Sequence, residues 1–148
     1  MALANPMQRK VVVDTGPLVS ILRENDQAHP LCTETIRALQ LPLWTTWAVI
    51  TEAAWLLRRS AHEVDSLIVM LELQTIRCTQ LGDDFAPWCR EMLKEYRDLK
   101  PQLADLTLLY IAEEIDTNTI FTLDRRDFTV FRNSKGEPFE LLPEAFPG

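Results

Sequence analysis

The sequence predicts an α/β fold, a three-layer α/β/α sandwich in which helices cover both faces of a mostly parallel sheet. Residues 11–13 are three consecutive valines, a β-branched run without a polar face that is typical of a strand buried on both sides. Short apolar runs of this kind alternate along the chain with longer segments of helical character. No stretch marks a domain boundary, a repeat or a linker, so we expect residues 1–148 to form a single domain.

The first strand ends abruptly at an acid, a hydroxyl, a glycine and a proline, residues 14–17. Gly16 is expected to permit a sharp exit from the strand. Pro17 suits the first position of a helix, where its missing N–H costs nothing, and this helix is expected to continue through Arg23.

The remaining elements alternate in the same way. Ser60 and Glu63 have the spacing of a capping box, which predicts a helix start at this point. The predicted strands are residues 43–47, 75–79, 119–123 and, at an edge of the sheet, 139–142. The predicted helices are residues 31–39, about 51–59, 61–71, about 85–97 and 103–115, followed by a short loop or helix after residue 124.

The composition is that of a globular protein, with 47% hydrophobic and 25% charged residues. The 22 acids exceed the 15 bases and give a formal net charge of -7. Long-range attraction to a polyanion is therefore not built into the whole surface. Any binding of nucleic acid requires a local basic patch or bound cations.

The cysteines and the apolar runs indicate the compartment. Cys32, Cys78 and Cys89 are odd in number and form no CxxC pair, which favours free thiols in a reducing environment. Residues 1–8 lack the apolar core of a signal peptide, and no apolar run approaches the roughly 20 residues of a membrane span. These features predict a cytoplasmic protein without a membrane segment.

Four acids are placed where they can meet. Asp14 and Asp124 each follow a predicted strand, and parallel strands end at one edge of their sheet. Glu52 falls in the first turns of the helix after the second strand. Asp105 lies near the start of the helix that precedes the strand before Asp124. A helix that leads back to the start of a strand begins at the carboxyl edge of the sheet, so Asp105 is expected near Asp14. Asp14 taken alone is equally compatible with a helix-capping role, and Glu52 and Asp105 lie where a helix dipole favours negative charge.

Carboxylates held within a few ångströms repel one another unless a cation compensates their charge. Magnesium takes oxygen ligands and retains waters, so a few carboxylates suit it well. Zinc is disfavoured, because His29 and His62 are the only histidines and neither has ligand spacing with another histidine or a cysteine. Both histidines are expected on the surface, and the four tryptophans in the core or at an interface.

Four segments resemble the PIN-domain ribonucleases, and particularly the VapC-type toxins of bacterial toxin–antitoxin pairs. The similar segments are residues 12–18, the Thr51-Glu52 pair, residues 96–105 and residues 122–128, which together span most of the chain. Two positions depart from the family pattern: Leu106 stands where a small residue is usual, and Gln102 where an additional acid is common.

The resemblance implies a metal site and an activity. The family's acids correspond to Asp14, Glu52, Asp105 and Asp124, which would hold one or two Mg²⁺ or Mn²⁺ ions that activate water for attack on an RNA phosphodiester. It also implies a homodimer and a small antitoxin protein that blocks the site.

The roles of several neighbouring residues remain open at this stage. Asp127 is an alternative or a support for Asp124, and the hydroxyls of Thr15 and Thr122 are expected to hold ligand carboxylates or waters of the metal. Candidate contacts to RNA phosphates are Arg58, Arg59, Arg125, Arg126, Arg132 and Lys135.

Other classes of protein fit the pattern less well. A receiver domain would place adjacent acids after the first strand, but Thr15 and Gly16 follow Asp14. A dinucleotide-binding domain would need a GxGxxG loop, which is absent. The serious rival is a non-catalytic PIN-like module that binds RNA or a protein without hydrolysis.

Overall fold

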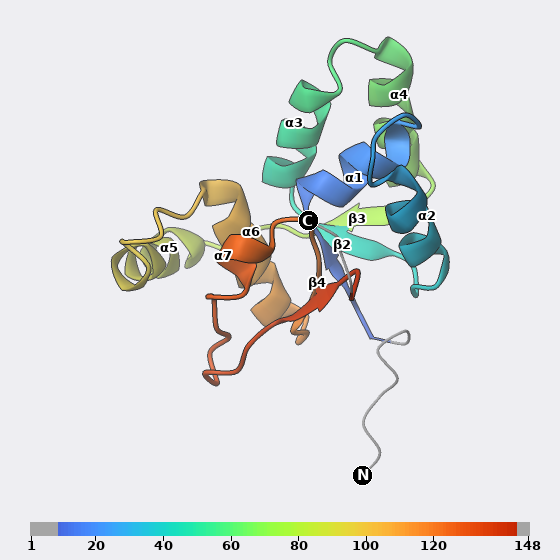
Figure 1. Ribbon diagram of the computed structural model, residues 1–148. Coiled ribbons are helices and arrows are strands. Elements are labelled where there is room, and N and C mark those ends of the chain that lie inside the picture. The colour runs from blue at the N-terminus through green and yellow to red at the C-terminus, as the bar shows by residue number, and fades with distance from the viewer. Residues whose placement is uncertain (1–8, 145–148) are drawn as a thin grey trace.

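A five-stranded parallel sheet forms the centre of the computed structural model, which describes residues 9–144 (Figure 1). Its order is β3-β2-β1-β4-β5, and all four strand pairings are parallel. The prediction of a mostly parallel sheet is therefore confirmed. The strands are β1 (Val12–Val13), β2 (Leu43–Thr45), β3 (Ile76–Cys78), β4 (Thr119–Phe121) and β5 (Glu140–Leu142).

Helices cover both faces of this sheet, as predicted. The chain steps from β1 to β2 to β3 and then returns to place β4 on the other side of β1. Because crossovers between parallel strands are generally right-handed, this reversal puts the helices of the two halves on opposite faces (Figure 1). The first group is α1 (Thr15–Leu22), α2 (His29–Arg37), α3 (Trp47–Leu56) and α4 (Ala61–Glu72). The second group is α5 (Phe85–Glu95), α6 (Leu103–Glu114) and α7 (Arg125–Phe128).

The order of the strands creates a switch point between β1 and β4. Val12 of β1 pairs with both Trp44 of β2 and Ile120 of β4, so crossovers leave the carboxyl ends of β1 and β4 toward opposite faces. Ligand sites of open α/β sheets lie in the crevice at such a point. Asp14 follows β1 at this position, and Asp124 comes three residues after the end of β4.

The core fills the space between the sheet and the helices. The three valines of residues 11–13 are completely buried, as expected for a strand covered on both faces. Helix α6 is buried continuously from Asp105 to Ala112, because it lies against the middle of the sheet. The rings of Phe128 and Phe131 are fully buried and meet edge to face, which anchors the short helix α7.

Helix α1 begins two residues earlier than expected. The prediction placed Pro17 at its first position, but the helix starts at Thr15 because Asp14 caps it. Proline is tolerated at the third position, since the first four N–H groups of a helix lack an intrahelical partner. Gly16 consequently lies inside the helix, and a Cβ added there would already touch Leu123 at 3.4 Å.

Helix α3 also begins earlier than expected, at Trp47 instead of Thr51. The second strand accordingly ends at Thr45, and Thr46 caps the helix by accepting a hydrogen bond from the N–H of Val49. Glu52 therefore lies in the second turn of α3, not at its start.

Several smaller predictions are confirmed. Ser60 caps α4 by accepting from the N–H of Glu63, and β5 lies at an edge of the sheet. All three cysteines are free thiols. Trp44 and Trp88 are partly buried against the core. Trp47 and Trp55 do not belong to the core, because they are 60% and 63% exposed on α3.

Two further predictions concern a signal peptide and membrane-spanning segments. The expectation for residues 1–8, that they contain no signal peptide, lies outside the described residues. Between residues 9 and 144, none of the helices combines the length and the apolar character that crossing a bilayer demands.

Candidate functional site

Asp14 joins the end of β1 to the start of α1. It is 7% exposed, and its Oδ1 accepts a hydrogen bond of 2.8 Å from the N–H of Thr15. Its Oδ2 accepts a second one, of 2.9 Å, from the hydroxyl of Thr122. The capping role and the site role are thus compatible, since one oxygen caps the helix while the other lies toward β4.

Thr122 connects the ends of the two central strands. Its hydroxyl donates to Asp14 and also accepts a hydrogen bond of 2.9 Å from the N–H of Asp124. The fully buried side chain of Thr122 therefore helps to position both Asp14 and Asp124. The expectation that Thr122 holds a candidate ligand carboxylate agrees with this geometry.

Asp105 lies at the third residue of α6 and is 6% exposed. Its pKa is raised to about 7, mainly by burial and in addition by the nearby carboxylates of Asp14, Asp124, Asp127 and Glu52. Several negative charges surround this buried acid, and no residue between 9 and 144 forms an ion pair with it.

The pKa of Asp14 is also raised, to about 6. Burial is the main cause, and the hydrogen bonds from Thr15 and Thr122 partly oppose it by favouring the charged carboxylate. The negative charges of Glu52 and Asp124 add to the increase. Asp14 and Asp105 therefore both carry an electrostatic cost when ionised, which a bound cation would remove.

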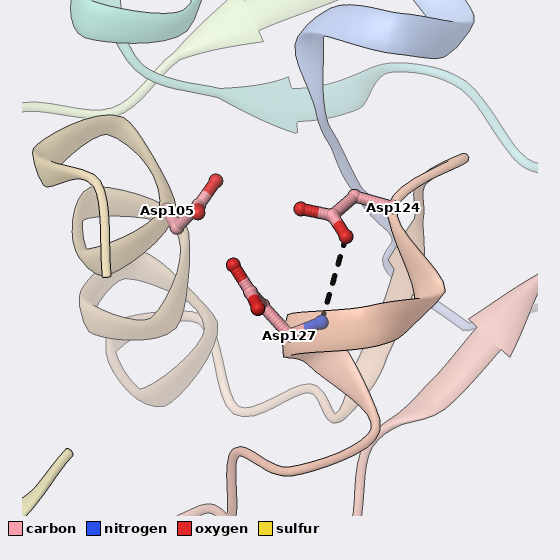
Figure 2. A group of neighbouring side chains, drawn as sticks. All are labelled: Asp105, Asp124 and Asp127. Atoms are coloured by element: carbon pink, nitrogen blue, oxygen red, sulfur yellow. Dashed lines mark hydrogen bonds between the residues drawn. The ribbon is translucent and has the colours of Figure 1, made fainter. Parts of the chain in front are cut away.

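The side chains of Asp124 and Asp127 point toward that of Asp105, which comes from α6 (Figure 2). One carboxylate oxygen from each of the three acids lies within 4.8 Å of the others. Asp124 caps α7, although the hydrogen bond from the N–H of Asp127 is long at 3.5 Å. Burial and the charge of Asp124 raise the pKa of Asp127. Asp124 and Asp127 thus both lie close enough to Asp105 to share a cation with it.

A cavity of about 320 Å³ lies beside these acids, between residues of α1, α3 and the start of α6. It contains all four acids that the sequence singled out, and Asp127 is not in its wall. Its lining consists of Asp14, Thr15, Gly16, Glu52, Leu56, Gln102, Asp105, Leu123 and Asp124.

The helices that carry Glu52 and Asp105, α3 and α6, are connected by a hydrogen bond between two threonines. The hydroxyls of Thr46 and Thr107 form a buried hydrogen bond of 2.8 Å, which joins the start of α3 to the first turns of α6. Thr107 also donates to the carbonyl of Ala104. No sequence pattern predicts this contact, because it depends on how α3 packs against α6.

The two departures from the family pattern have different consequences. Gln102 is the residue before α6 and lines the cavity, so the amide replaces an acid at its wall. Leu106 is completely buried and is absent from the cavity lining. The leucine therefore belongs to the core and leaves the acids accessible.

The donor set fits a hard divalent cation. The cavity lining contains carboxylates, an amide and a hydroxyl but no histidine or cysteine, which favours magnesium or manganese over zinc. The hydroxyl oxygen of Thr15 is buried and has no hydrogen-bond partner within residues 9–144. An unpaired hydroxyl beside desolvated carboxylates is suited to a cation or to one of its waters.

The predicted basic contacts differ in accessibility. Nε and Nη2 of Arg125 are buried and have no partner among the described residues, so this guanidinium is poorly placed for a phosphate. Arg126 is largely exposed and lies 4.0 Å from Asp127. Arg58 and Arg59 are exposed at the end of α3, where the unpredicted Arg23 joins them.

Comparison with known families agrees with the fold. The family model described as "PIN domain" matches residues 11–133, which include every acid discussed above. The chain belongs to the PIN domain family. The resemblance to the VapC-type toxins is also confirmed by the individual relatives.

Two proteins of Mycobacterium tuberculosis are similar to this chain. Ribonuclease VapC26 of strain ATCC 25618 / H37Rv is 24% identical over 135 residues, covering 90% of this chain and 100% of the relative. The crystal structure of VapC20, named as a sarcin–ricin-loop-cleaving toxin, superimposes with a TM-score of 0.71 at 15% identity. That match covers 79% of this chain and 92% of VapC20, and it shows the shared fold.

Proposed function

We propose that this protein is a metal-dependent endoribonuclease and the toxin of a toxin–antitoxin pair. The observation that carries the proposal is the convergence of Asp14, Asp105 and Asp124 around one cavity, with burial raising the pKa values of the first two. The names of the two similar proteins, a ribonuclease and a sarcin–ricin-loop-cleaving toxin, support RNA as the substrate class.

The four acids have distinct proposed roles. Asp14 and Asp105 hold a Mg²⁺ or Mn²⁺ ion, and Asp124 completes the site directly or through a water. Glu52 either ligates the ion or orients the attacking water from the second turn of α3. Thr122 fixes the carboxylate of Asp14, while Asp127 supports the site from the side of Asp124.

A bound divalent ion would lower the pKa of water and neutralise the negative charge that develops on the phosphate. The protein's own contribution is to hold carboxylates in fixed positions within a partly buried cavity. Asp14 is restrained by two hydrogen bonds, so its oxygens need little reorganisation when an ion binds.

A cognate antitoxin, a homodimeric state and a cytoplasmic location complete the proposal. They follow from the family resemblance, and the exposed Trp47 and Trp55 on α3 offer apolar surface for a protein contact.

Calorimetric titration with Mn²⁺ tests the metal site without knowledge of the RNA. The wild type is compared with Asp14→Asn/Asp105→Asn and with the control Asp65→Asn/Asp98→Asn, which removes two exposed acids outside the cavity. We expect saturable binding in the wild type and the control, and its loss in the first variant. Binding that persists in Asp14→Asn/Asp105→Asn would contradict the proposed ligands.

Cleavage of RNA distinguishes the enzyme from a non-catalytic module. We expect the wild type and the control variant to cut cellular RNA with Mn²⁺ or Mg²⁺, and Asp14→Asn to remain folded but inactive. A folded wild type that binds RNA and neither binds metal nor cuts RNA would favour the non-catalytic alternative.

A further inference from the structure

A groove lined by three arginines lies beside the acidic cavity. It has a volume of about 440 Å³ and forms where the end of α1 and the end of α3 meet the start of α4. Arg23, Arg58 and Arg59 line it, and Glu63 is the one acid in its wall. Leu56 lines both this groove and the acidic cavity, so the two sites adjoin.

Two of the arginines are fixed by the end of α3. Arg23 donates a hydrogen bond of 2.9 Å to the carbonyl of Leu56, and its Nε lies 3.8 Å from Glu63. Arg58 donates to the carbonyl of Trp55, and its guanidinium lies over the indole ring at 3.9 Å from the ring centre. Each guanidinium carries five N–H groups, so these contacts leave donors available for an anion.

The third arginine has no structural explanation. Arg59 is exposed and makes no hydrogen bond or ion pair with any residue in the described range 9–144. Arg23 and Arg58 contribute to the helix end by binding its last carbonyls, whereas Arg59 contributes only charge. The planar guanidinium of Arg59 is therefore available to pair with an anion in the groove, because its donors match the oxygens of a phosphate or carboxylate.

We propose that this groove binds backbone phosphates of the RNA strand next to the phosphodiester held in the acidic cavity. The inference rests on the proposed function and adds how the substrate is held. The protein's net charge of -7 and its acidic cavity both repel RNA, so binding needs positive charge from a local basic patch or from bound cations. The groove supplies it, with three arginines against one acid, at the boundary of the cavity.

The chemistry of the groove indicates contacts to the backbone and not to bases. Guanidinium groups pair with phosphate oxygens through parallel hydrogen bonds, which position a strand without reading its sequence. An acidic peptide offers similar oxygens, but the wall shared through Leu56 links the groove to the site where a phosphodiester would lie. The groove is therefore assigned to the same RNA strand.

The test measures RNA binding without cleavage. Fluorescence anisotropy follows a labelled short single-stranded RNA of mixed sequence in EDTA, over a range of salt concentrations, with the full-length protein. The variants are Arg58→Gln/Arg59→Gln, the single variant Arg59→Gln, and a charge-matched control Arg90→Gln/Arg97→Gln on α5 and the turn after it. Thermal unfolding of each variant checks that it is folded.

We expect the double variant to bind RNA more weakly than the control and to show a shallower salt dependence. Losing two phosphate contacts to a single strand lowers the slope of log K against log salt by about 1.4, from about 0.7 per phosphate. Arg59→Gln should give about half of this change, and it does not remove a contact that stabilises the fold. In cleavage assays the double variant should raise KM more than it lowers kcat.

The outcomes separate this inference from the proposed nuclease activity. If the double variant and the control bind and cleave RNA equally, the groove is not a phosphate site, although the metal site stands. If RNA binding depends on Arg59 while no metal binds, the groove stands and the nuclease proposal fails. The inference would be overturned in favour of an acidic peptide if the arginine substitutions weakened the binding of a labelled polyglutamate and left RNA binding unchanged.

Discussion

The hydroxyl of Thr122 donates a hydrogen bond of 2.9 Å to the carboxylate of Asp14, although 108 positions separate the two residues in the sequence. The same oxygen accepts the N–H of Asp124, so a single side chain sets the positions of two candidate ligands. The contact joins the carboxyl ends of the two central strands, where the order of the sheet reverses. The first prediction concerns this contact.

Thr122→Val removes the hydroxyl and keeps the branched shape of the side chain. We expect weaker Mn²⁺ binding, because Asp14 loses the donor that orients it, and a loss of about 1 to 3 kcal/mol in the free energy of unfolding, because the N–H of Asp124 is left unpaired. Calorimetry and urea unfolding measure the two effects. Thr122→Ser restores the hydroxyl and should recover most of the metal affinity; failure to do so would argue against an orienting role.

The two acids of the α7 segment should differ in importance. Asp124 lines the cavity together with Asp14. Asp127 lies near Asp105 but is not part of the cavity lining. We expect Asp124→Asn to reduce Mn²⁺ affinity and RNA cleavage more than Asp127→Asn. Both substitutions remove one charge from the same helix, so each serves as the control of the other. An equal or reversed order would make Asp127 the fourth ligand.

The stability of the metal-free protein should fall as the pH rises from about 4 to about 7. The pKa values of Asp14 and Asp105 rise from 3.8 to about 6 and about 7, so the folded protein holds protons that the unfolded chain releases in this range. Because the folded state binds more protons, its contribution to stability from these groups is present at low pH and lost as the pH passes the folded pKa values.

Urea unfolding in EDTA at about pH 5 and about pH 8 measures this effect. Asp105→Asn removes the larger of the two shifts, so we expect the variant to be more stable than the wild type at about pH 8 and to show a smaller decline. Comparison within each pH cancels the contributions of the other acids. Parallel stability profiles for the two proteins would show that Asp105 is not strained by burial.

The contact between Thr46 and Thr107 should matter for stability. Thr46→Ala removes both the cap of α3 and the buried hydrogen bond to α6, so we expect a loss of about 1 to 3 kcal/mol in the free energy of unfolding. Thr51→Ala is the matched control, since its hydroxyl bonds only to the carbonyl of Trp47 in the same helix and is exposed. The control should change stability by no more than about 0.5 kcal/mol. Equal losses in the two variants would show that the helix contact contributes nothing.

The positions of the acids follow from the sequence to a large extent. Asp14 and Asp124 could be brought together on paper because parallel strands end at one edge, and Asp105 because its helix begins at that edge. The three acids do line one cavity. Glu52 also lines it, although its helix begins five residues before it and not at the expected Thr51.

Features that depend on the packing of distant segments could not be predicted from the sequence. The approach of Asp127 to Asp105 requires the four-residue helix α7, which is too short to leave a periodic pattern. Arg23 reaches the groove because α1 packs against α3 and α4, and nothing near residue 23 indicates this. The sequence predicts Arg125 as a contact to RNA phosphates, yet part of its guanidinium is buried.

The sequence by itself determined the fold class, the order of the elements and the edge of the sheet where the acids gather. These properties depend on local patterns: runs of β-branched residues, capping residues and acids directly after strands. The tertiary structure decided where α1 and α3 begin, which hydroxyls orient the acids and how strongly burial raises their pKa values. The reason is physical, because desolvation and long-range hydrogen bonds arise only when distant segments pack together.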